Sequence, residues 1–141
     1  MPYATQADMI ERFGEREVIA LADRDMNGVI DTAVVSSAIT LAGHEIEGYL
    51  SGRFTLPLST VPPLLTAICC DITRYRLCGT EVQTTDEVRA RYKDAAKMLE
   101  MIRDGKMTLG LDATSKVVGG GDTVLIADGR RTFTKDALSD Y

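Results

Sequence analysis

Side chains that bind transition metals or act as nucleophiles are scarce in this sequence. Its one histidine is His44, and its three cysteines are Cys69, Cys70 and Cys78. None has the spacing of a zinc site, because Cys69 and Cys70 are adjacent on a predicted helix and point in different directions. We therefore expect reduced thiols that pack as small apolar side chains, and we predict no metal and no other cofactor.

Excess positive charge and long apolar runs are lacking too. Lysine and arginine number 16 against 21 aspartates and glutamates, so the net charge is -5 at pH 7. No overall basic field is available for gripping nucleic acid. No apolar run approaches the roughly 20 residues of a membrane-spanning helix, and the start MPYATQADMIERF has no signal-peptide pattern. We expect a soluble protein, made in the cytoplasm, with no membrane partner.

The main pattern in the sequence is the helical spacing of its apolar residues. Three long segments carry apolar residues at three- and four-residue steps: Asp31 to Leu50, Pro63 to Leu77, and a helix that begins at a Thr84–Glu87 capping box and reaches Asp104. Their apolar stripes are Val35, Ile39, Ala42, Ile46 and Tyr49; Leu64, Leu65, Ile68, Ile72 and Tyr75; and Val88, Tyr92, Ala95, Leu99 and Ile102.

Two shorter helices are predicted in front of them. Thr5 and Asp8 fit a capping box, Gly14 ends that helix, and Glu15 to Ala22 forms the next. Neither is long enough to be stable without packing on something larger. The sequence therefore predicts a mainly α protein, a small helical bundle of three long and two short helices.

The segment Asp23 to Val34 copies the first nine positions of an EF-hand calcium loop. Its ligand-type residues are Asp23, Asp25, Asn27 and Asp31, with Gly28 at the turn. Val34, however, stands where the bidentate glutamate should be. An interpretation without metal is favoured, in which Asn27-Gly28 makes a turn with positive φ and Asp31 caps the next helix.

The stretch from Ile46 to Pro63 is too apolar for a solvated linker. Its prolines force extended backbone and then suit a new helix start. We expect an ordered loop that packs on the helices or on a neighbouring subunit. The interface candidates in it are Tyr49, Arg53, Phe54, Leu56 and Leu58.

Charged residues on the predicted helices are assigned to structure rather than to catalysis. Asp71 precedes Arg74 by three residues and could equally reach Arg53, so we expect a structural ion pair. Glu45, beside His44, is expected on a solvated flank, because no nucleophile accompanies it. The mixed charges of the third long helix likewise predict a solvated face. We expect no enzyme activity.

The helical pattern of apolar residues does not continue to the end of the chain. Residues 106–111 are expected to form a short strand or an extended arm, and a run of three glycines at 119–121 holds no regular element. We therefore divide the chain into a helical domain, 1–111, and an extended C-terminal arm, 112–141. Phe133, Leu138 and Tyr141 complete the interface candidates; they either anchor the arm on a partner or belong to a disordered tail.

Several motifs along the chain resemble one family of phage proteins. They are YATQADMIERFGE, DRDMNGVID, EIEGYLSGRFTLPLSTVPPLL, CDITRYRL, VRARYKDAAKMLEMIRDGKMTLG and the closing RTFTKDALSDY. The most specific part is IEGYLSGRFTLPL followed by VPP and DITRYRL. The chain thus resembles the Mu-like phage head-tail connector, or neck adaptor, proteins, over most of its length through Gly110.

This resemblance implies a helical structural protein of the virion neck. Such adaptors form a homo-oligomeric ring, commonly dodecameric, that joins the portal protein to a stopper or tail-completion protein. DNA passes through the channel without sequence-specific binding, and the negative charge balance agrees with that passage. The alternative is a small phage accessory protein in DNA packaging or regulation that binds protein or nucleic acid transiently. No catalytic residue carries over.

Overall fold

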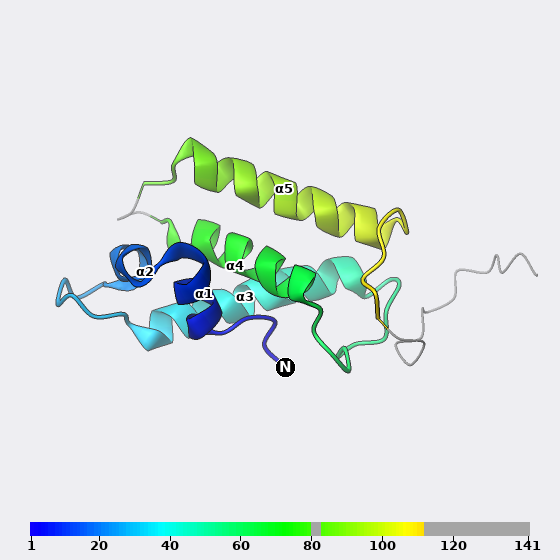
Figure 1. Cartoon of the computed structure of the whole chain (residues 1–141), viewed down its shortest axis with the longest axis horizontal. Helices are drawn as coiled ribbons and strands as arrows, with labels where there is room; N and C mark the ends of the chain where they lie inside the picture. The colour runs from blue at the N-terminus through cyan, green and yellow to red at the C-terminus, as the bar shows by residue number, and fades with distance from the viewer. Residues whose placement is uncertain (80–82, 112–141) are drawn as a thin grey trace, which may run out of the picture.

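The computed structural model describes residues 1–79 and 83–111 (Figure 1). Within these ranges all regular elements are helices: α1 (Gln6–Phe13), α2 (Glu15–Ala22), α3 (Thr32–Leu50), α4 (Pro63–Leu77) and α5 (Asp86–Arg103). The prediction of a mainly α protein with two short and three long helices is confirmed. None of these helices is long and apolar enough to cross a membrane.

Side-chain caps set where the helices begin. The Thr5 hydroxyl accepts the backbone N–H of Asp8, whose carboxylate accepts the N–H of Thr5, so the predicted capping box at α1 is confirmed. The cap of α5 was predicted one residue too early. Thr85, not Thr84, accepts the N–H of Val88, and because the third helical position is then valine, no side chain returns the bond.

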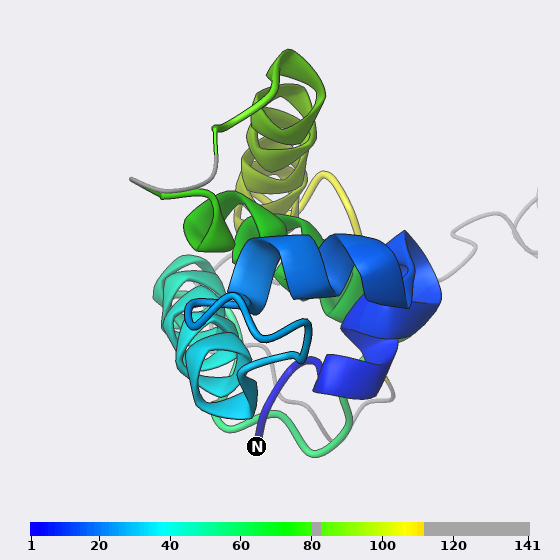
Figure 2. The ribbon, with the colours of Figure 1, turned by 90° about the vertical axis from the view of Figure 1, so that its left-hand side faces the viewer.

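Helix α4 lies in the middle of the bundle and packs on α1, α2, α3 and α5. Viewed along the bundle, green α4 lies between α5 above it and cyan α3 at the lower left (Figure 2). Residues all round α4 are therefore buried, whereas its apolar stripe predicted one buried side. The buried residues are Leu65, Ile68, Cys69, Cys70, Asp71, Ile72, Thr73, Arg74 and Leu77.

The cysteines of α4 are free, as predicted. Burial raises the pKa of the Cys69 thiol to about 11 and that of Cys70 to about 12. Both thiols are therefore protonated at neutral pH and pack as apolar side chains.

The α3–α4 connector, residues 51–62, packs on the chain's own helices. Phe54 and Leu58 are buried in the core, and Leu56 is half-buried against it. Of the two alternatives for this loop, packing on the helices is thus confirmed. After α5, residues 108–111 form no regular element, so the short strand expected there is absent from the described residues, and Leu109 is buried against the same core.

Candidate interaction surface

A cluster of charged side chains joins the short helices to α4 and α5. The Asp71 carboxylate accepts two hydrogen bonds from Arg12, at 3.2 and 2.8 Å, and lies 4.0 Å from Arg91. The predicted pairing of Asp71 with Arg74 or Arg53 is wrong. Spacing along the sequence predicts contacts only between residues that are close in the chain, whereas Arg12 lies on α1, 59 residues before Asp71.

Arg74 is buried and belongs to the same cluster. It forms ion pairs with Glu17 of α2 and, at 3.6 Å, with Glu87 of α5. Its guanidinium carbon lies 4.7 Å from the ring centroid of Phe13, which the guanidinium of Arg12 also approaches. Each carboxylate is matched by an arginine, so the cluster fixes the helices against α4.

A second polar group lies between α3, α4 and α5. Glu45 accepts a 2.8 Å hydrogen bond from the Tyr92 hydroxyl and pairs with Arg76. The Tyr92 ring stacks on Tyr75 with centroids 4.1 Å apart. The expectation that Glu45 lies on a solvated flank is therefore wrong: only 14% of its side chain is exposed, because α5 covers it.

Tyr92 makes the stability of the folded chain depend on pH in the alkaline range. Burial, and then the hydrogen bond and charge of Glu45, raise the pKa of Tyr92 to about 12, above the value near 10 of an unfolded chain. The folded state therefore favours the neutral, protonated phenol. The contribution of Tyr92 to the free energy of unfolding is complete below about pH 10 and is lost between about pH 10 and 12.

We expect Tyr92→Phe to lower the free energy of unfolding at pH 7 by about 1 kcal/mol, because a hydrogen bond to a largely buried carboxylate is lost. It should also reduce the fall in stability between pH 10 and 12, since phenylalanine does not ionise. Urea unfolding at pH 7, 10 and 11.5 measures both. The remaining fall should include Tyr3, whose pKa burial also raises to about 12, so Tyr3→Phe is the matched comparison. An unchanged pH profile in Tyr92→Phe would contradict the assignment.

The loop between α2 and α3 uses its side-chain oxygens for its own turn. The Asp23 carboxylate accepts the N–H groups of Asn27 and Gly28, and Asp31 caps α3 as predicted. Positive φ occurs at Gly28, as predicted, and at Met26 rather than Asn27. Within the two described ranges, no three or more histidine, cysteine or acidic residues are grouped to hold a metal ion.

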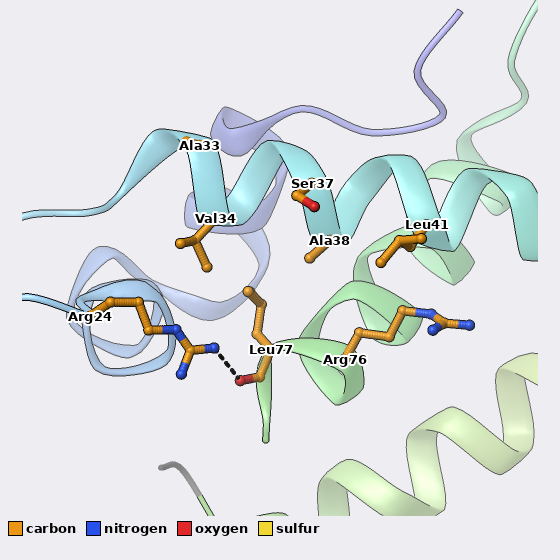
Figure 3. Close-up of a pocket in the computed structure, with 8 residues that line it drawn as sticks. All are labelled: Arg24, Ala33, Val34, Ser37, Ala38, Leu41, Arg76 and Leu77. Atoms are coloured by element: carbon orange, nitrogen blue, oxygen red, sulfur yellow. Dashed lines mark hydrogen bonds between the residues drawn. The ribbon is translucent and has the colours of Figure 1, made fainter. Parts of the chain in front are cut away.

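The same loop displays apolar side chains to solvent. In the loop, Met26 is 91% exposed and Val29 is 64% exposed. On α3, which follows the loop, Leu41 is 50% exposed. A groove of about 470 Å³ begins beside the loop and runs between α3 and the end of α4 (Figure 3). Its lining residues are Arg24, Ala33, Val34, Ser37, Ala38, Leu41, Arg76 and Leu77.

This α3–α4 groove has an apolar floor and two arginines on its rim. Arg24 and Arg76 lie on opposite sides of Leu77, with the α3 side chains facing them (Figure 3). The sequence offered one signal that pointed here: Leu41 is a large apolar residue that falls outside the predicted stripe of its helix. The groove itself depends on how α4 crosses α3.

The interface candidates predicted from sequence lie elsewhere. Phe54 and Leu58 fill the chain's own core, which accounts for their apolar character. The others in the described part, Tyr49 in the last turn of α3 and Arg53 and Leu56 in the connector, are half-buried. Phe133, Leu138 and Tyr141 lie outside the described residues. A role for all eight in contacts between subunits stays a prediction.

Arg53 also caps a helix inside the chain. Its guanidinium donates a 2.6 Å hydrogen bond to the carbonyl of Ile102, in the last turn of α5, and lies beside Gly105. We expect Arg53→Met to lower the free energy of unfolding by about 1–2 kcal/mol, because the carbonyl loses a charged donor while the aliphatic packing remains. Thermal unfolding followed by circular dichroism measures this. Arg103→Met is the matched control, and an equal loss there would argue against the cap.

Comparisons with a family model and with individual proteins point to the same family. Residues 3–127 match the family described as Bacteriophage Mu, Gp36. "Gene product J" of Escherichia phage Mu is 34% identical over 137 residues, which cover 96% of each chain. "Mu-like prophage FluMu protein gp36" of Haemophilus influenzae is 34% identical over 116 residues, 82% of this chain and 81% of that protein. The protein therefore belongs to the bacteriophage Mu Gp36 family of phage proteins.

Proposed function

We propose that this chain is a structural protein of the phage particle, the head-tail connector of the virion neck. Its copies form a homo-oligomeric, dodecameric ring that binds the portal protein on one side and the stopper or tail-completion protein on the other. DNA passes through this ring without sequence-specific contacts. Membership in the Mu Gp36 family supports the proposal, together with the motifs IEGYLSGRFTLPL and DITRYRL, which resemble those of head-tail connector proteins.

The physical character of the chain supports a scaffold role. Its buried charged groups are matched across helices: Asp71 by Arg12, and Glu45 by Arg76. Such pairs hold helices in fixed positions and leave neither of these two carboxylates available for acid-base work. The net charge of -5 disfavours adhesion to passing DNA. We propose that the chain is a rigid adaptor and not an enzyme.

Quantitative mass spectrometry of purified phage particles tests this function. A ring matched to the portal predicts roughly one copy of the chain per portal subunit, retained through a high-salt wash. The portal protein in the same sample is the internal standard. An accessory protein of packaging or regulation, the alternative function, would be present in the infected cell and absent from the finished particle. That second result would overturn the connector proposal.

A further inference from the structure

Residues 1–4 form a strap that leads from the N-terminus to α1 (Figure 1). Tyr3 and Ala4 are buried in the core, whereas Met1 and Pro2 are exposed. Within the described part of the chain, one hydrogen bond ties this N-terminal strap to a helix: the Tyr3 hydroxyl donates to Oε1 of Glu47 on α3, at 3.4 Å. No backbone hydrogen bond joins residues 1–4 to any other described residue. The strap is therefore held in place by side chains, and chiefly by Tyr3.

The Tyr3 ring lies in a socket at Gly43 of α3. A Cβ at this position would be 3.3 Å from Cδ2 of Tyr3, so a larger residue would crowd the ring. Glycine inside a helix lowers its stability, because glycine has the most conformational freedom to lose. The close approach of Tyr3 accounts for glycine at position 43, whereas a Cβ at Gly48 would meet nothing within 4 Å. The socket therefore fits one aromatic ring, and Glu47, one turn further along α3, accepts its hydroxyl.

Two hollows lie between the strap and α3. Their volumes are about 240 Å³ and about 390 Å³, and the α3 residues that line both are Ser36, Ile39 and Thr40. The strap thus covers this part of α3 without filling the space beneath it. Burying one ring stabilises the closed strap by an amount similar to the cost of ordering four residues. Opening of the strap should therefore cost much less than unfolding of the whole core.

We propose that the N-terminal strap is a latch, with the Tyr3 ring as its catch and Gly43 as its socket, which opens and closes while the five helices stay folded. Opening exposes Ile39 and Gly43 on α3 and frees an N-terminal segment that carries an aromatic side chain. Helix α1 stays in place, because the pair of Arg12 with Asp71 holds it on α4 independently of the strap. The latch does not depend on the proposed connector function, and no other chain is needed for it to open.

Cleavage by chymotrypsin after Tyr3 tests whether the latch opens by itself. The protease reaches this bond only in the open state, because the closed state buries Tyr3. Mass spectrometry follows the loss of residues 1–3 from the unsubstituted chain, at low protease concentration and in urea below the unfolding transition. A local opening exposes little surface, so the cleavage rate should change by about twofold or less over this range. A rate that rises with urea as steeply as global unfolding would overturn the inference.

Two leucine variants of α3 test the socket. Gly43→Leu fills the socket and should hold the latch open, whereas Gly48→Leu adds the same side chain where nothing lies within 4 Å. We expect cleavage after Tyr3 to be about tenfold faster or more in Gly43→Leu and unchanged in Gly48→Leu, at equal helix content by circular dichroism. Equal rates in the two variants would also refute the latch. The urea series uses the unsubstituted chain, so it remains a test even where Gly43→Leu fails to fold.

The Tyr3 phenol gives a second readout of the same two variants. Burial, and then the charge and hydrogen bond of Glu47, raise the pKa of Tyr3 to about 12 in the closed state, with a smaller contribution from Cys69. An open latch returns this pKa to about 10, the value of an exposed phenol. At about pH 11 the phenol should therefore be mostly ionised in Gly43→Leu and mostly neutral in Gly48→Leu. Nuclear magnetic resonance of labelled tyrosine measures this, with the Tyr3 signal identified by its loss in Tyr3→Phe. A neutral phenol in both variants would contradict the socket.

Discussion

Replacing Ile68 with alanine is expected to lower the free energy of unfolding by about 3–4 kcal/mol. Ile68 is fully buried on α4, the helix that packs on all four others. Removing its outer carbons loses transfer free energy and leaves a cavity that neighbours on several sides cannot all collapse to fill. Because single domains have a total stability of about 5–15 kcal/mol, this one change should remove a large share.

Urea unfolding followed by circular dichroism measures this loss. Leu41→Ala is the matched control, because it removes a similar side chain from α3 that is half exposed. It should change the free energy of unfolding by about 0.5 kcal/mol or less. Equal losses in the two variants would show that α4 is not the centre of the core.

Periodicity and capping chemistry are local, and they predicted the helices closely. Pro63 to Leu77 was expected as a helix and is one with those bounds. The capping box of Thr5 was identified correctly because both of its partners lie within four residues. The cap of α5 was assigned to the wrong one of two adjacent threonines, because Thr84 and Thr85 each have an acidic residue within three positions.

Tertiary partners were not predictable in the same way. The pairing of Asp71 with Arg12, and of Glu45 with Tyr92, joins residues far apart in sequence, and only the packing of five helices brings them together. An apolar stripe also gives one face of a helix, whereas α4 has neighbours on several faces. The α3–α4 groove follows from that packing, so its sequence signal was limited to Leu41.

Arg12→Met should lower the free energy of unfolding by about 2–3 kcal/mol. The Asp71 carboxylate is 8% exposed and receives both of its hydrogen bonds at 3.2 Å or less from Arg12. Without them, its nearest cation is Arg91 at 4.0 Å, so a charge stays buried with one weak partner. The loss should fall short of the full cost of an isolated buried charge, because Arg91 can move closer.

The double variant Arg12→Met/Asp71→Leu separates pairing from packing. Removing both charges of a buried pair is often close to neutral, so the double variant should recover at least half of the loss measured for Arg12→Met alone. Arg89→Met is the control, since its partner Asp86 is fully exposed and the change should leave unfolding nearly unaltered. If the double variant is less stable than Arg12→Met, the loss in Arg12→Met does not come from leaving the Asp71 carboxylate unpaired. The attraction within the ion pair would then be what holds α1 on α4.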